Sequence, residues 1–361
     1  MTSPCRTDTK AARGALLALI AGVAWMVVST PAFARNTLDV LTWCDHEDPA
    51  LLGPFEKAND VKVNFKDIDS TAAALAVLGQ SKPGDWDVLV ADETDTGRLA
   101  GLGLLAPLDA KDFPFGDIPA AIASPKLTSV NGVLYSVPEK FGYNTIAYNK
   151  TTFDAAAAAD INSPWDPKYK GRVAVYDYYV PEIEYTAIAL GMNPEKLTDA
   201  DLPAIKAKLI ALKQNAAMVG DVTTVQQALA TGAVDVLFGG GEWVTAGLAH
   251  DNPNLNYTIP KQGGVRWQQG LSVFATSQKK DLATKFIQYI LSPEGQGKLA
   301  TSSCYWGMPA NSKAVLTDDQ KTILRWSDQP TYIKTTFPYL QMTPDFDKKL
   351  QAMWAEVLQS K

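Results

Sequence analysis

The chain has 361 residues, of which 46% are hydrophobic and 20% are charged, and its formal net charge at pH 7 is −6. This length suggests roughly two domains, each able to bury a hydrophobic core. An acidic chain of this kind is a poor binder of nucleic acid, whose phosphates attract basic surfaces, so we expect no nucleic-acid partner.

The first residues have the pattern of a secretion signal. Three cations lie among the first 13 residues, and an apolar run follows at 15–28. This run is too short to span a bilayer comfortably. Ala32 and Ala34 then form an A-x-A cleavage pattern. We therefore expect a signal peptide at 1–34, cleaved after Ala34, and an exported chain; an uncleaved anchor helix is the alternative.

Apolar strand patterns and helical patterns alternate after this segment. Residues 37–43, 61–68 and 86–92 are typical of strands, and 50–59 and 70–80 are typical of the helices between them. The third strand is almost continuously apolar, which is typical of a parallel strand buried on both faces. This β-α-β-α-β order predicts the α/β class with a parallel sheet.

The alternation continues to the end of the chain. Residues 133–150 read as two strands that meet at a turn at 142–144. The remaining predicted elements are strands at 171–179, within 224–249 and at 265–275, and helices at 182–192, 202–214, within 224–249, at 281–300 and at 347–359.

Tyrosines and carboxylates are concentrated where one of these strands ends. The segment 176–185 holds four tyrosines, including Tyr178, together with Glu182. Loops at the carboxyl ends of parallel strands are where open α/β sheets bind ligands. Aromatic rings and carboxylates together can hold an organic cation. A surface loop, or a ferric site with Tyr178 and Tyr179 as phenolate ligands, are the alternatives.

Two further strand ends carry candidate ligand-binding groups. Three glycines at 239–241 let a backbone approach a ligand closely, and Glu242 after them favours a cationic or hydroxylated ligand. Asp92 and Glu93 end the strand at 86–92. Each has a structural alternative, because the glycines can form a tight turn and the carboxylates can cap a helix.

The sequence offers little to an enzyme. His46 and His250 are the only histidines, and neither a G-x-S-x-G elbow nor an H-E-x-x-H motif occurs. The polar run 45–48 contains His46, but four adjacent residues cannot all face one ion. We therefore predict no catalytic activity, no cofactor and no metal site.

The two cysteines that follow the predicted cleavage point suggest a disulfide. They are Cys44 and Cys304. Two cysteines in an oxidising compartment favour one bond between them. Closing a loop of about 260 residues would stabilise the fold by of order 4–5 kcal/mol in the chain-entropy model. Two buried free thiols are the alternative.

Several segments together carry a resemblance to a known family. They are Trp43 at the end of the first strand, "WDVLVADETDTGRLAGLGLLAPLD" (86–109), "FGYNTIAYNK" (141–150), "KYKGRVAV" (168–175) and "PKQGGVRW" (260–267). In these segments the chain is similar to the periplasmic spermidine/putrescine-binding proteins of ABC importers. The resemblance covers nearly all of the chain after residue 34. It implies the two-lobed type II periplasmic binding protein fold, with each lobe a mainly parallel sheet flanked by helices.

The same resemblance implies where the lobes and the ligand lie. The ligand lies in a cleft between the lobes, and closure signals loading to the permease. The implied boundaries are lobe one at 36–146 plus 273–361, lobe two at 147–272, and hinge strands near 145–148 and 271–274. We expect a monomer in the periplasm whose partners are a small amine ligand and the membrane subunits of the permease.

The resemblance, with the motifs above, also gives a candidate site. The predicted ligand-binding residues are Trp43, Asp45, Asp92, Thr94, Phe141, Tyr178, Glu182, Phe238, Glu242, Trp267, Gln269 and Trp306. It also brings together the segments of Cys44 and Cys304, so that a disulfide between them would pin the Trp43 loop to the Trp306 loop.

The implied function is capture of a polyamine such as putrescine or spermidine for import. One departure weakens this reading, because polyamine receptors carry an aspartate where this chain has Gln269. Arg266 also precedes Trp267. A monoamine or zwitterion (γ-aminobutyrate, a betaine or an amino-acid-like solute), with its carboxylate near Arg266, is therefore an alternative ligand. A sensory binding protein, an Fe(III) receptor and a secreted enzyme are the remaining alternatives.

Overall fold

A computed structural model describes residues 36–68 and 70–360. Arg35–Lys361 form one compact unit. The predicted signal peptide and its cleavage site after Ala34 lie outside the described residues. Within the described ranges, none of the helices combines the length and the apolar character needed to cross a bilayer.

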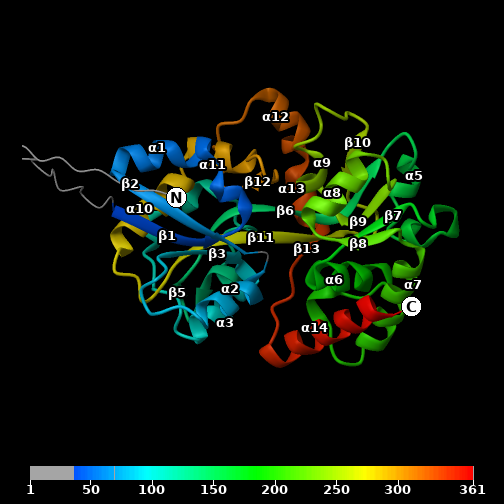
Figure 1. Ribbon diagram of the computed structural model, residues 1–361, viewed down its shortest axis with the longest axis horizontal. Coiled ribbons are helices and arrows are strands. Elements are labelled where there is room, and N and C mark those ends of the chain that lie inside the picture. Colours follow the sequence, from blue (N-terminus) through cyan, green and yellow to red (C-terminus); the bar gives the residue numbers. More distant parts are fainter. Residues whose placement is uncertain (1–35, 69, 361) are drawn as a thin grey trace, which may run out of the picture. The chain divides into compact units, whose positions relative to one another are not determined.

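A single large sheet organises the described part of the chain, where it has eleven strands (Figure 1). Along its main path the order is β2-β1-β3-β11-β6-β9-β7-β8. These strands are β1 (Asn36–Thr42), β2 (Val61–Asp67), β3 (Val88–Asp92), β6 (Val137–Asn149), β7 (Val173–Tyr176), β8 (Met218–Gly220), β9 (Val236–Gly240) and β11 (Gly264–Val273). Beside this path, β10 (Leu255–Thr258) and β12 (Met308–Pro309) pair with β6, and β13 (Thr336–Pro338) pairs with β11. A separate hairpin joins β4 (Ser129–Val130) to β5 (Val133–Leu134).

The sheet contains two parallel strand groups. In the first group β1 pairs in parallel with β2 and β3, and in the second β7 pairs in parallel with β8 and β9. The predicted α/β class with parallel strands is therefore confirmed. The long antiparallel strands β6 and β11 connect the groups: β11 pairs with β3, and β6 pairs with both β11 and β9.

The predicted turn at 142–144 is wrong, because β6 runs unbroken from Val137 to Asn149. Gly142 is instead required within β6 because two side chains approach its backbone closely. A Cβ on Gly142 would lie 1.6 Å from the Glu242 side chain and 2.4 Å from the Trp267 ring. The glycine therefore allows two side chains to lie directly against the strand rather than letting the chain reverse.

Helices cover the strands and begin at recognisable caps. The α-helices are α1 (Pro49–Asn59), α2 (Thr71–Leu78), α3 (Thr96–Gly101), α4 (Pro125–Thr128), α5 (Ala155–Ala158), α6 (Tyr179–Ala189), α7 (Leu202–Asn215), α8 (Val222–Ala230), α9 (Glu242–Thr245), α10 (Lys280–Ile290), α11 (Pro293–Ala300), α12 (Asp318–Ile323), α13 (Gln329–Thr335) and α14 (Pro344–Gln359). Short 3-10 helices η1 (Cys44–Glu47) and η2 (Glu93–Asp95) follow β1 and β3. Asp48 and Ser70 cap α1 and α2, because their side chains accept hydrogen bonds from the free amides of Ala50 and Ala73.

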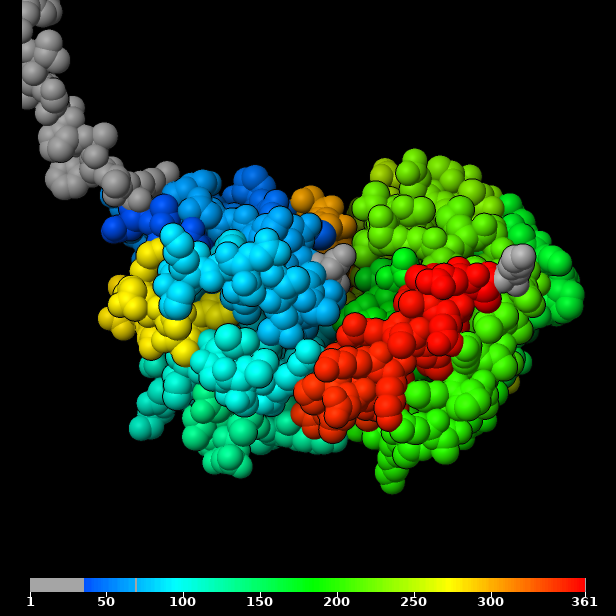
Figure 2. Space-filling model, turned by 60° about the horizontal axis from the view of Figure 1, so that its bottom comes forward, coloured from blue at the N-terminus to red at the C-terminus, as the bar shows by residue number. Residues whose placement is uncertain are grey.

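The last helix, α14, packs against α6 and α7. Figure 2 shows α14, in red, on the molecular surface with its start beside cyan residues that include α3. Asp347 near this start accepts hydrogen bonds from Arg98 of α3 at 2.8 Å and from the Tyr179 hydroxyl of α6 at 2.5 Å. One carboxylate thus joins three helices that are far apart in the sequence. The lobe boundaries themselves stay a prediction.

Candidate functional site

A cavity of about 50 Å³ lies at the carboxyl ends of parallel strands from both groups. Its lining is mainly aromatic. The lining residues are Trp43, Asp92, Asn144, Tyr176, Tyr178, Val222, Trp243, Trp267, Gln269, Tyr305 and Tyr339. Trp43 follows β1, Asp92 ends β3 and Tyr176 ends β7. This is the position at which open α/β sheets bind ligands.

The structure brings five of the twelve predicted ligand-binding residues together in this cavity. They are Trp43, Asp92, Tyr178, Trp267 and Gln269. The rest of the predicted set, which does not line it, is Asp45, Thr94, Phe141, Glu182, Phe238, Glu242 and Trp306.

Two of these others lie next to the cavity. Thr94 lines a smaller cavity that shares Asp92 and Tyr178 with the first. In the segment that follows Cys304, Tyr305 lines the main cavity. Trp306 lies against Gly247 instead, and a Cβ added to that glycine would be 3.4 Å from the Trp306 ring.

Packing explains where two of the predicted aromatics go. Phe238 lies in the core against Tyr185, with ring centroids 4.7 Å apart. Phe141 packs edge-on against Tyr143 at 6.3 Å. Both come from sheet strands whose side chains alternate between faces, so a shift of one residue separates a cavity position from a core position.

The predicted acidic residues after β7 and β9 are also turned away from the cavity. Both carboxylate oxygens of Glu242 face the backbone amide of Tyr143, at 3.1 and 3.2 Å. Glu182 is buried behind Gly239, where a Cβ would lie 1.7 Å from its Oε1. Burial raises the pKa of Glu242 to about 8 and the pKa of Glu182 well above its ordinary value. Glu242 is therefore largely protonated at neutral pH, and burial favours the protonated form of Glu182 as well.

The polar groups of the cavity form three hydrogen-bonded pairs. The Tyr178 hydroxyl donates to Asp92 Oδ2 at 2.7 Å, and the Tyr305 hydroxyl donates to Gln269 Oε1 at 3.0 Å. In the third pair, Tyr339 donates to Asn144 Oδ1 at 2.7 Å. Burial raises the pKa of Asp92 to about 7, although the hydrogen bond from Tyr178 opposes that shift. Asp92 is thus poised to gain a full negative charge when a cation approaches.

Two indole nitrogens of the lining are without a partner. Trp43 Nε1 and Trp243 Nε1 are buried and make no hydrogen bond to any residue the structure describes. An indole N–H can only donate. Each could therefore pair only with an acceptor atom.

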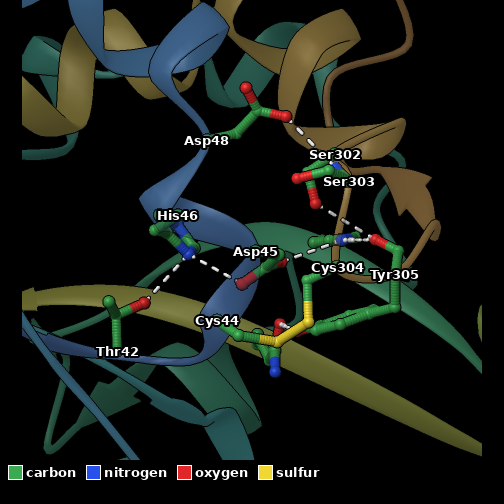
Figure 3. The surroundings of a disulfide bond; sticks show 11 residues. Thr42, Cys44, Asp45, His46, Asp48, Ser302, Ser303, Cys304 and Tyr305 are labelled. Atoms are coloured by element: carbon green, nitrogen blue, oxygen red, sulfur yellow. Dashed lines mark hydrogen bonds and ion pairs between the residues drawn. A yellow bond between two sulfur atoms is a disulfide. The ribbon is translucent and has the colours of Figure 1, made fainter. Parts of the chain in front are cut away.

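The wall that contains Trp43 is anchored by a disulfide (Figure 3). Cys44, which follows Trp43, is bonded to Cys304, which precedes Tyr305, with the two Cα atoms 6.0 Å apart. The predicted disulfide is therefore present. It joins the two loops that carry these cavity aromatics.

Buried charges beside the disulfide hold the same wall. Asp45 accepts from Lys140 Nζ at 2.8 Å and lies 3.0 Å from His46 Nδ1, while His46 Nε2 lies 2.9 Å from Glu139. Lys140 also donates to the Tyr305 carbonyl at 2.9 Å. All four charged side chains are buried. Asp45 is therefore committed to this network and is not free for a ligand.

Burial raises the pKa of Glu139 and lowers that of Lys140, so the charged forms in this network are favoured most clearly for Asp45 and His46. Burial would raise the pKa of Asp45, but Lys140 and His46 hold it well below its usual range. Burial would lower the pKa of His46, but Glu139 and Asp45 raise it to about 10. The ion pairs thus tie η1 to strand β6 and to the Tyr305 loop.

Sequence reasoning missed six lining residues: Asn144, Tyr176, Val222, Trp243, Tyr305 and Tyr339. Four lay inside segments already singled out, including Trp243 in the glycine-rich turn and Tyr305 beside Trp306. Val222 and Tyr339 carried no signal. Across residues 36–68 and 70–360, His, Cys, Asp and Glu side chains form no group of three that could hold a metal ion.

The comparison with known families now decides the class of the protein. Residues 50–331 match the family described as bacterial extracellular solute-binding protein. The chain belongs to this family. Its members are solute-binding proteins rather than enzymes, and they work with ABC importers.

Individual relatives and structures agree with this family. The spermidine/putrescine-binding periplasmic protein 1 of Haemophilus influenzae is 24% identical over 279 residues, which is 76% of each chain. A putative spermidine/putrescine ABC transporter structure from Listeria monocytogenes has a TM-score of 0.78 and 25% identity, covering 90% of this chain and 100% of that one. The structure of a GABA receptor has a TM-score of 0.73 at 18% identity, covering 90% and 98%. These neighbours confirm the predicted type II periplasmic binding protein fold and the predicted family.

Proposed function

We propose that this chain is the extracytoplasmic receptor of an ABC importer and captures a small organic solute that carries an amine. The solute binds in the aromatic cavity and is delivered to the membrane subunits of the permease. The observation that carries this proposal is Asp92, a buried carboxyl group with Tyr178 at 2.7 Å, set among aromatic rings.

The chemistry of the cavity suits a cation. Ring faces attract a positive charge through their quadrupole, most strongly those of tryptophan. Trp43, Trp243 and Trp267 all belong to the lining. Ammonium binding would ionise Asp92, whose pKa burial raises to about 7, and would form a charge-assisted hydrogen bond with it.

The number of amines in the ligand follows from the number of carboxylates. Relatives named for spermidine and putrescine support an amine ligand. However, Asp92 is the one acidic residue that lines this cavity in the described part of the chain. Glu182 and Glu242 lie outside the lining, and burial favours the neutral form of each. The geometry therefore favours a ligand with one amine, and the polyamine is the second candidate.

The rest of the proposal follows the family. The chain is exported to the periplasm with cleavage after Ala34, works as a monomer, and closes two lobes over the ligand by bending near 145–148 and 271–274. It has no catalytic, metal or nucleic-acid-binding role. Gene neighbours that encode an ATPase and permeases would distinguish transport from a sensory role.

A thermal-shift screen of residues 35–361 tests the proposal. The panel holds putrescine, spermidine, monoamines, betaines, amino acids and Fe(III). A ligand at one hundred times its dissociation constant adds about 2.7 kcal/mol to the free energy of unfolding, which gives an easily measured shift. Stabilisation by at least one amine is expected. Stabilisation by Fe(III) alone, or by no member of the panel, would contradict the proposed function.

A further inference from the structure

The residues that line the cavity carry hydrogen-bond donors that a purely cationic ligand cannot use. The buried indole N–H groups of Trp43 and Trp243 have no acceptor within residues 36–68 and 70–360. Because Tyr305 donates to Gln269 Oε1, the side-chain nitrogen of Gln269 is the group that can donate to a ligand. An ammonium group also only donates, so a polyamine gains no hydrogen bond from the nitrogen of Gln269, whereas an acceptor group does.

The side chains that line the cavity offer few free hydrogen-bond acceptors. Asp92 Oδ2 accepts from Tyr178, so Oδ1 can accept from one ammonium group. Asn144 is already engaged on both sides, because it donates to the Gly239 carbonyl and accepts from Tyr339. The lining thus offers one carboxylate for a cation and, in Gln269, a donor for an anion or another strong acceptor.

The sheet register places the two kinds of group side by side. Gln269 of β11 pairs directly with Asp92 of β3 in an antiparallel ladder. Directly opposite residues point to the same face, with Cβ atoms about 4.5–5.5 Å apart. A ligand that meets both groups therefore needs its ammonium group and its acceptor group only a few atoms apart. The cavity volume of about 50 Å³, room for only a few water molecules, also favours a compact ligand.

We infer that the ligand is a compact zwitterion: its single ammonium group binds Asp92, and its carboxylate accepts a hydrogen bond from the side-chain nitrogen of Gln269. This inference rests on the proposed function and names the class of its solute. It assigns the carboxylate to a neutral donor rather than to Arg266. That guanidinium is buried outside the cavity lining and donates to the Ile333 carbonyl at 3.0 Å.

A matched set of four-carbon compounds tests the inference by isothermal titration of residues 35–361. The set is 4-aminobutanoate, putrescine, butylamine and butanoate, which differ only in their end groups. We expect 4-aminobutanoate to bind about 10- to 100-fold more tightly than the other three. Putrescine and butylamine lack the carboxylate, and butanoate lacks the ammonium group. Tighter binding of putrescine or butylamine would overturn the zwitterion and leave the amine receptor intact. Failure of all four, and of the amine panel, would overturn both.

The variant Gln269→Glu provides a second, independent readout. It keeps the shape of the side chain, replaces the donor by a carboxylate and sets a second negative charge beside Asp92. Binding of 4-aminobutanoate should weaken, and binding of putrescine should tighten, each by about tenfold. The control Gln278→Glu makes the same charge change at an exposed position and should alter neither. Unchanged preference in Gln269→Glu, with its melting temperature preserved, would contradict the role assigned to Gln269.

Discussion

Replacing Asp92 by asparagine should remove most of the affinity for an amine ligand. Asparagine keeps the size of the side chain and an oxygen that can accept from Tyr178, so the cavity wall is preserved. What is lost is the charge opposite the ammonium group. Hydrogen bonds to charged groups contribute about 1.5–3 kcal/mol, so the dissociation constant should rise by about 10- to 150-fold.

The same substitution should abolish the pH dependence of binding. Burial raises the pKa of Asp92 to about 7 in the free protein, and the ammonium group binds the ionised form. Affinity of the native chain should therefore be constant above about pH 8 and fall by about tenfold for each unit below pH 7. In Asp92→Asn no carboxyl group titrates at this position, so the affinity should be low and nearly flat.

Isothermal titration between about pH 5.5 and 8.5, with the amine that binds most tightly, measures both effects. The control is Asp95→Asn, which removes a nearby carboxyl group that does not line the main cavity. Burial is the largest cause of the raised pKa of Asp92, the hydrogen bond from Tyr178 opposes it, and the nearby Asp95 adds a smaller upward shift. The control should thus shift the pH midpoint slightly downward and keep the plateau affinity. Native-like binding by Asp92→Asn, or a persisting pH dependence, would refute the assignment of the ammonium group to Asp92.

Three further outcomes follow from the wall that carries Trp43 and Tyr305. Replacing both Cys44 and Cys304 by serine should lower the free energy of unfolding by about 2–5 kcal/mol, with the chain-entropy figure near the upper end, and should weaken ligand binding; urea unfolding and titration measure the two effects. Asp45→Asn should cost about 3–5 kcal/mol, because it leaves the buried Lys140 without its counter-charge, and adding Lys140→Met should recover part of that loss. The melting temperature should fall as the pH rises from about 5 towards 10. The pKa of Glu242 is raised to about 8 and that of His46 to about 10 in the folded chain, so each group stabilises the fold only while it holds its proton. A melting temperature that rises over that range would contradict these protonation states.

Local patterns were sufficient to predict the α/β class, and the family resemblance added the type II periplasmic binding protein fold and most of the candidate site. Apolar strand runs and the helical pattern at 70–80 predicted the α/β class and a helix that the structure contains as α2. The end of strand 86–92 pointed to Asp92, and the resemblance pointed to Trp43; both line the cavity. These predictions succeed because strand ends in a parallel sheet converge on one edge whatever the rest of the chain does.

Side chains with distant partners could not be placed from the sequence. Asp45 was expected to face the ligand, but it is paired with Lys140, 95 positions later. Glu242 was expected there too, yet it faces the amide of Tyr143, 99 positions earlier. Tyr339 reaches the cavity from a segment without any motif and is fixed by Asn144, 195 positions away. Such contacts depend on how the chain folds back, which periodicity and spacing do not record.

A crystal structure of residues 35–361 with the amine that binds most tightly is the measurement to make. The ligand should lie among Trp43, Trp243 and Trp267, with its ammonium nitrogen within about 3 Å of Asp92 and an acceptor group near Gln269. A ligand bound elsewhere, or one bound in this cavity with its amine turned away from Asp92, would contradict the site proposed for this solute receptor.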